Sequence, residues 1–164
     1  MNITAKLAGI AVTVAAAPLL STTSAQAVTP DTVYFSYGDE VNCAITADGI
    51  VGCDVTPNRV PAVAVGDTWV PLPVPINQVI IDQPELPAHP GVTPKAFTLP
   101  GGNPRMSDVK TGEGYASIEV AHGGATCVAT GGHYSGPGLS CTAKGHAFSL
   151  YATGGGFRSG VLMS

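Results

Sequence analysis

The four cysteines are the residues whose chemistry the sequence constrains most closely. Their spacings are C-x9-C, for Cys43 and Cys53, and C-x13-C, for Cys127 and Cys141. Redox and zinc sites use C-x-x-C pairs instead, and no histidine lies within ten residues of the first pair. In an exported chain, four cysteines indicate two disulfides. In the loop-entropy model each would contribute roughly 3 kcal/mol to the free energy of unfolding.

The stretch VNCAITADGIVGCDV predicts a β-hairpin in which Cys43 opposes Cys53. A three-residue loop, 47–49, puts Gly49 at the position where such loops need a left-handed backbone. In that register the apolar pairs share a face with the two sulfurs, because strand side chains alternate. These pairs are Val41 with Val55 and Ile45 with Val51. Cysteines that face each other on paired strands can form a disulfide.

The stretch ATCVATGGHYSGPGLSCTA predicts a second hairpin, with Cys127 opposite Cys141 and Ala129 opposite Leu139. Its Gly-rich loop, 131–138, is longer and fixes the register less firmly. The predicted disulfides are therefore Cys43–Cys53 and Cys127–Cys141.

Histidine and serine side chains form no catalytic or metal-binding pattern in this sequence. The four histidines, His89, His122, His133 and His146, have neither the i, i+4 nor the H-x-H spacing of metal ligands. Ser135 and His133 share the motif GHYSG, which differs from the G-x-S-x-G nucleophile elbow, and no third group accompanies them. We expect solvated turn residues and one packed histidine, His146.

Glycoside hydrolysis needs two carboxylates across a cleft, and the sequence offers Asp82 with Glu85 or Glu113 with Glu119. Nothing in their spacing indicates a cleft, and we expect ordinary solvated side chains. The glycine-rich stretches GGNP and GGGF lack the strand-to-helix context of a phosphate loop. The sequence therefore predicts no catalytic residue, no cofactor site and no metal site, and a protein that is not an enzyme.

The first residues predict export. Lys6 precedes an apolar stretch, 7–20, and Ala25-Gln26-Ala27 is an A-x-A cleavage site. We predict a signal peptide over 1–27 and a single secreted β-rich domain over 28–164, extracellular or in the cell envelope, with no stable membrane span. The alternative is an N-terminal membrane anchor, which Pro18 and the lack of a charged stop disfavour.

The composition limits the partners and the fold class. The net charge is −4 and the basic residues form no cluster, so binding to a nucleic-acid backbone is not expected. Charged residues make up 11% of the chain, against 21 Gly and 14 Pro, which favours turns and short strands over helices. We predict an all-β fold, either a small antiparallel sandwich or a meander barrel, with two disulfide-stapled hairpins.

A proline-rich connection, 57–104, separates the two cysteine hairpins. Proline removes hydrogen-bond donors, so we expect most of it to be a long loop or an insert and not a central strand. Gln78–Ile81 is predicted as a short strand, and Trp69 is expected to anchor the connection to the core or to form a recognition surface. Further strands are predicted at 33–37, 115–121, 126–130, 139–143 and 146–152, with the tail frayed or forming a last edge strand.

The two cysteine blocks resemble a family of small secreted proteins of actinobacteria. Those proteins carry an early block F-x-S-P-S-G-N-I-x-C-x-I…G-x-V-x-C-D-I and a late block C…G-V-x-C…G-H-G-F-x-L-S. Here the blocks read FSYGDEVNCAITADGIVGCDV and TCVATGGHYSGPGLSCTAKGHAFSL, with SYGDE replacing S-P-S-G-N and GHAF replacing GHGF. The resemblance implies an exported, disulfide-bonded, β-rich protein and implies no catalytic activity.

A second resemblance is to the antitumour chromoprotein apoproteins of the same bacteria. It rests on one hairpin motif, C-A-x-x-x-x-G-x-x-x-C, matched from Cys43-Ala44 through Gly49 to Cys53. That family has an immunoglobulin-like sandwich that holds a small apolar ligand, and the resemblance implies the same role here.

Three functions are compatible with these observations. The first is an exported, non-enzymatic protein that binds an extracellular or cell-envelope partner. The second is a secreted protease inhibitor that presents the proline-rich segment or the 131–138 loop as a rigid decoy. The third is a carrier of a small apolar ligand.

Overall fold

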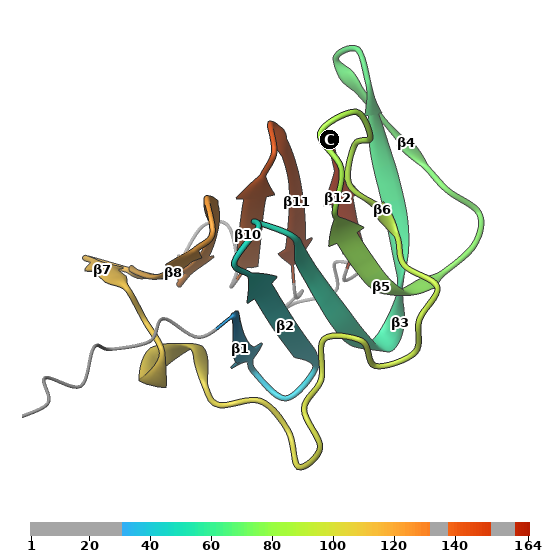
Figure 1. Cartoon of the computed structure of the whole chain (residues 1–164). Helices are drawn as coiled ribbons and strands as arrows, with labels where there is room; N and C mark the ends of the chain where they lie inside the picture. Colours follow the sequence, from blue (N-terminus) through green and yellow to red (C-terminus); the bar gives the residue numbers. More distant parts are fainter. Residues whose placement is uncertain (1–30, 132–137, 152–159) are drawn as a thin grey trace, which may run out of the picture.

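The computed structural model describes residues 31–131, 138–151 and 160–164. In this part of the chain the regular structure is nearly all strand, with one short 3-10 helix, η1 (Met106–Asp108). The strands form a curled sheet, a half-barrel, in the order β1-β2-β3-β12-β11-β10-β9-β8-β7, with β4 and β5 also on β3 and β6 on β5 (Figure 1). The all-β prediction is confirmed.

The strands are β1 (Thr32–Tyr37), β2 (Val41–Thr46), β3 (Val51–Val65), β4 (Thr68–Pro71), β5 (Ile76–Ile81), β6 (His89–Pro90), β7 (Gly112–Gly114), β8 (Ser117–His122), β9 (Ala125–Thr130), β10 (Gly138–Ala143), β11 (His146–Tyr151) and β12 (Gly160–Met163).

The long strand β3 belongs to both halves of the sheet. Its first half pairs with β2 and β5, and its second half pairs with β12 and β4. The pairing register shifts between Asp54 and Arg59, and an irregularity of this kind bends a strand. Pro57 falls within this irregularity, where a missing backbone donor is tolerated.

The proline-rich connection contains more strand than the sequence predicts. Ala62 and Val63 of β3 pair with both β12 and β4, and Val79 and Ile80 of β5 pair with both β3 and β6, so these parts are central strand. Most of 57–104 still lies outside the strands, as expected. The prediction of a short strand at Gln78–Ile81 is confirmed by β5.

The last strand, β12, lies inside the sheet and not at its edge. It pairs in parallel with β3 and antiparallel with β11. Val161 and Met163 alternate into the core and are buried. The expectation of a frayed end or an edge strand is therefore wrong for 160–163. The reason is that β3 leaves one side of its second half open for a partner, which sequence spacing does not reveal.

The first cysteine hairpin has the predicted register. Cys43 lies opposite Cys53, Val41 opposite Val55 and Ile45 opposite Val51, and all six side chains are buried in the core. Gly49 has the predicted left-handed backbone, with φ of 74°. Cys43 and Cys53 form a disulfide.

The second cysteine hairpin is also confirmed, in β9 and β10. Cys127 lies opposite Cys141 and forms a disulfide with it, and Ala129 lies opposite Leu139. With β7, β8, β11 and β12, these strands form an antiparallel meander. Both disulfides belong to the same hydrophobic core, which joins the two halves of the curled sheet.

The helix η1 lies where the two ends of the curled sheet approach each other. It contacts β1 on one side and β8 on the other, and its Met106 is buried in the core. Just before it, Pro104 accepts a hydrogen bond from the backbone of Ser36, at 2.7 Å. This contact, with the isolated bridge between Ser36 and Arg105, occupies part of the free edge of β1, and an occupied edge is less open to pairing with other chains.

A crossing segment, residues 91–104, packs on the outer face of the first hairpin. The ring of Phe97 lies against Gly52, where a Cβ would come within 2.1 Å of it. The carboxylate of Asp54 accepts hydrogen bonds from the Phe97 backbone and the Thr98 hydroxyl, at 2.9 and 2.7 Å. Of the two sequence-based alternatives, a packed loop or a semi-flexible insert, the structure has the packed loop.

Asn103 fixes the end of the crossing segment. Its amide nitrogen lies 3.1, 3.0 and 2.9 Å from the carbonyl oxygens of Phe35, Cys43 and Phe97, and its amide oxygen accepts a hydrogen bond from Leu99. One side chain therefore joins β1, β2 and the crossing segment.

We predict that Asn103→Ala lowers the free energy of unfolding by about 2–4 kcal/mol, because it removes the partners of several part-buried backbone groups. The matched control is Asn58→Ala, since Asn58 is exposed, and we expect it to change stability by less than about 0.5 kcal/mol. Urea denaturation of both variants measures the difference. Equal midpoints for the two variants would contradict the role of Asn103.

Candidate ligand pocket

One end of the half-barrel is closed by three turns that meet. A Cβ on Gly123 would lie 2.2 Å from the carbonyl oxygen of Thr46, and Gly123 itself has φ of 54°. The ammonium group of Lys144 donates a hydrogen bond to the Asp48 carbonyl, at 2.8 Å. Thus the turns after β2, β8 and β10 are in contact, and no side chain separates the first two.

The Thr46 hydroxyl donates a hydrogen bond to the Asp48 carboxylate within the first of these turns. This bond is the main reason why the pKa of Asp48 lies below its ordinary value. The closed end is therefore held by polar contacts at the surface as well as by backbone contact.

The opposite end of the half-barrel carries a pocket of about 530 Å³. It lies between the β1–β2 turn, β3 and the end of β11. Among the described residues it is lined by Tyr37, Gly38, Asp39, Glu40, Val41, Val55, Arg59, Leu150 and Tyr151. Valine, leucine and tyrosine side chains supply its walls, and three charged side chains stand among them. The lining is therefore apolar with a small number of polar groups, as in most small-molecule sites.

Arg59 is the charged group of the inner wall. Its side chain is only 5% exposed, and it forms an ion pair with Glu40, whose side chain is 54% exposed. Burial of a cation is costly unless the cation is paired. The charge of buried Arg59 is therefore compensated by a carboxylate that is itself more than half exposed to water.

Tyr37 stands between this pocket and a second, shallower hollow of about 360 Å³ beside β7, β8 and β9. Burial raises the pKa of the Tyr37 phenol above its usual value. Tyr37 therefore contributes a partly buried side chain to the lining of both hollows.

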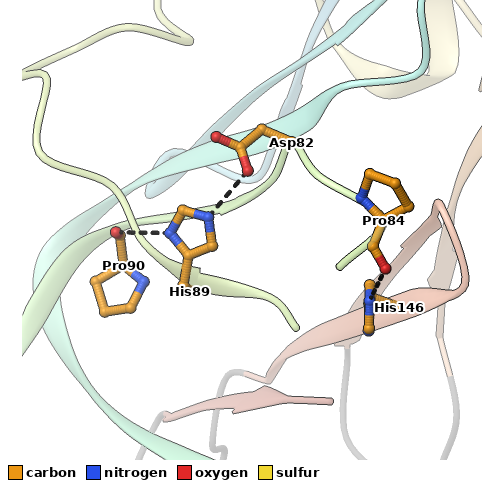
Figure 2. Close-up of polar contacts among 5 residues, drawn as sticks. All are labelled: Asp82, Pro84, His89, Pro90 and His146. Atoms are coloured by element: carbon orange, nitrogen blue, oxygen red, sulfur yellow. Dashed lines mark hydrogen bonds and ion pairs between the residues drawn. The ribbon is translucent and has the colours of Figure 1, made fainter. Parts of the chain in front are cut away.

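Two histidines brace an exposed loop between β5 and β6 (Figure 2). The His89 Nε2 lies 3.0 Å from a carboxylate oxygen of Asp82, and its Nδ1 lies 3.1 Å from the Pro90 carbonyl. From β11, the His146 Nε2 lies 2.9 Å from the carbonyl of Pro84. Residues 83–87 between these contacts are exposed. The loop is thus held at its base and at one point along its length.

The remaining candidate residues do not come together. Glu113 faces Ile118 across the β7–β8 pair while Glu119 faces Gly112, so the two carboxylates lie on opposite faces of the sheet. Glu85 is exposed, while Asp82 contacts His89. His133 and Ser135 lie outside the described residues.

Within 31–131, 138–151 and 160–164, no three His, Cys, Asp or Glu side chains gather as metal ligands would. His122 ends β8 next to Gly123, and its buried Nε2 has no hydrogen-bond partner among the described residues. Over the same ranges, we find no helix with the length and apolar character needed to cross a membrane.

Trp69 does not anchor the proline-rich connection to the core. It lies on β4 and is 45% exposed. It shares one face of the β3–β4 hairpin with Ala64, its partner in the register. This hairpin extends beyond the rest of the sheet (Figure 1). Of the two expectations for Trp69, the anchoring role is wrong, because β4 pairs on one side only and all four of its residues are exposed.

We compared the chain with protein-family models, with curated proteins and with solved structures, and found no match in any of the three.

Sequence reasoning missed the pocket and its Arg59–Glu40 pair. The two residues are 19 positions apart, and Arg59 lies beyond the irregularity in β3 that follows Asp54, so the hairpin register does not predict that they meet. One signal was present: Arg59 is the only Lys or Arg between Lys6 and Lys95. A single cation in a long stretch whose other charged residues are all acidic indicates a charge with a specific acidic partner.

Proposed function

We propose that this chain is an exported, non-enzymatic binding protein that holds a small, largely apolar molecule in the pocket beside Tyr37 and Arg59. The observation that carries the proposal is the pocket itself. Its volume of about 530 Å³ falls within the range of ligand sites, roughly 300–1,000 Å³.

The scaffold around the pocket supports this proposal. The opposite end is closed by contacting turns, and both disulfides cross-link strands of the core. A wall held in this way loses little conformational entropy on binding, which favours affinity. The pocket therefore suits a ligand that enters a preformed site.

Export is proposed from the sequence and is compatible with the structure. The signal peptide at 1–27 lies outside the described residues. The disulfides are consistent with an extracellular location. The resemblance to small secreted actinobacterial proteins supports an exported protein. The resemblance to chromoprotein apoproteins supports a β fold that holds a ligand.

We predict that the protein recovered from culture medium begins at Val28 and contains the links Cys43–Cys53 and Cys127–Cys141. Non-reducing peptide mapping by mass spectrometry measures both features in one experiment. Recovery of the uncleaved chain with the cells only, or of free thiols in the secreted chain, would contradict the export proposal.

We predict that the mature protein binds the neutral fluorophore N-phenyl-1-naphthylamine and that Val41→Phe weakens this binding by about tenfold or more, because the larger ring occupies the pocket. Val70→Phe makes the same substitution at an exposed valine and should leave binding unchanged. Fluorescence titration gives both dissociation constants.

Asp39→Trp provides a second blocking variant if Val41→Phe folds poorly, because Asp39 lines the pocket from an exposed turn. Asp39→Asn controls for the loss of charge. Binding that survives both Val41→Phe and Asp39→Trp, or no binding by the wild type, would argue against a ligand in this pocket.

A second candidate function, protease inhibition, is favoured by the braced loop at 82–89. Its contacts from His89 and His146 hold an exposed segment in a defined conformation, and a preorganised loop is what a decoy requires. If the loop inhibits, His146→Ala should raise the inhibition constant for a secreted serine protease by about tenfold, while Lys110→Ala, far from the loop in sequence, should not. Cleavage between 83 and 87 at substrate-like rates would exclude this role.

A further inference from the structure

We propose that the pocket selects an organic anion: a molecule with an apolar body and one carboxylate, which Arg59 binds in exchange for Glu40. This inference rests on the proposed binding function and adds the chemical class of the ligand. It is carried by the position of a buried guanidinium in the wall of an otherwise apolar pocket.

Arg59 has the capacity for a further partner. A guanidinium presents five N–H donors in a planar fork that matches a carboxylate. Among the described residues, its side chain makes one hydrogen bond, to one oxygen of Glu40. A ligand carboxylate that reaches Arg59 can accept two parallel N–H bonds, which is the stronger arrangement.

Glu40 is suited to exchange. Glu40 lies in the β1–β2 turn and its side chain is more than half exposed, whereas Arg59 is almost fully buried. When a ligand takes its place, the Glu40 carboxylate, which is already more than half exposed, moves into water and becomes fully hydrated. Arg59, in contrast, keeps a partner at all times, and no buried cation is left alone.

The other groups around the pocket are compatible with this exchange. Asp39 is exposed, so its repulsion of a bound anion is weakened by water and salt. The Tyr37 and Tyr151 phenols are the remaining titratable groups of the lining. Val41, Val55 and Leu150 provide the apolar surface for the body of the ligand. Because Asp39 and Glu40 also make the rim acidic, a cationic ligand is the opposing hypothesis that the experiment must address.

The test uses three ligands that share a ten-carbon chain and differ in charge: decanoate, decan-1-ol and decyltrimethylammonium. The displacement of N-phenyl-1-naphthylamine from the mature protein by each ligand is measured at pH 7. The two ionic ligands are kept below their critical micelle concentrations, and decan-1-ol below its solubility limit. We expect decanoate to bind about tenfold more tightly than decanol, as a charge-assisted bidentate contact warrants, and the cation to bind more weakly than decanol.

Two variants test whether the preference for decanoate over decanol comes from Arg59 and Glu40. Arg59→Met keeps an apolar stem and should abolish the preference for decanoate over decanol while N-phenyl-1-naphthylamine still binds. Glu40→Gln removes the competing carboxylate and should widen the preference. Arg105→Met, at an exposed arginine, is the matched control and should change neither affinity. If Arg59→Met does not fold, the Glu40→Gln result tests the exchange alone.

The outcomes separate the inference from the proposed function. Binding of N-phenyl-1-naphthylamine without a preference for decanoate, or with a preference for the cation, overturns the anion site and leaves the pocket intact. No binding of any probe overturns both. Sedimentation with phosphatidylglycerol vesicles, compared with phosphatidylcholine vesicles, identifies the source of the anion. Arg59-dependent sedimentation would assign the anion to a lipid phosphate and overturn the carboxylate ligand, whereas displacement by decanoate without sedimentation supports a free carboxylic acid.

Discussion

The pairing of β3 with four other strands is the constraint on which the rest of the structure depends. This strand has 15 residues, and its two halves take different partners: β2 and β5 first, then β12 and β4. The change of register between Asp54 and Arg59 allows one strand to serve both parts of the curled sheet. Without it, the first hairpin and the meander would be two separate sheets, each too small to bury a core.

The core that this arrangement creates is cross-linked from both halves. The Cys43–Cys53 disulfide lies in the first hairpin and the Cys127–Cys141 disulfide in the meander, and both are buried in one cluster. The crossing segment then covers the outer face of the first hairpin through Phe97, Asp54 and Asn103.

The pocket is a consequence of the same constraint. At one end the turns after β2, β8 and β10 contact each other and close the half-barrel. At the other end, the bend of β3 carries Arg59 into the wall, opposite the β1–β2 turn that carries Glu40. An apolar hollow with one buried, paired cation is the result. This geometry is the physical basis for the proposed binding function and for the choice of an organic anion.

The sequence by itself determined the local structure. Strand alternation and the Gly49 loop fixed the register of the first hairpin, and the same reasoning placed Cys127 opposite Cys141 and identified the strands of the meander. These features depend on residues close together in the chain, whose spacing dictates turn type and facing side chains. Only the tertiary structure decided the rest: the central position of β12, the strands within the proline-rich connection, the exposure of Trp69 and the pairing of Arg59 with Glu40. Each depends on which distant segment fills the open side of β3 or the open end of the half-barrel, and a contact between distant segments leaves no periodic signal in the sequence.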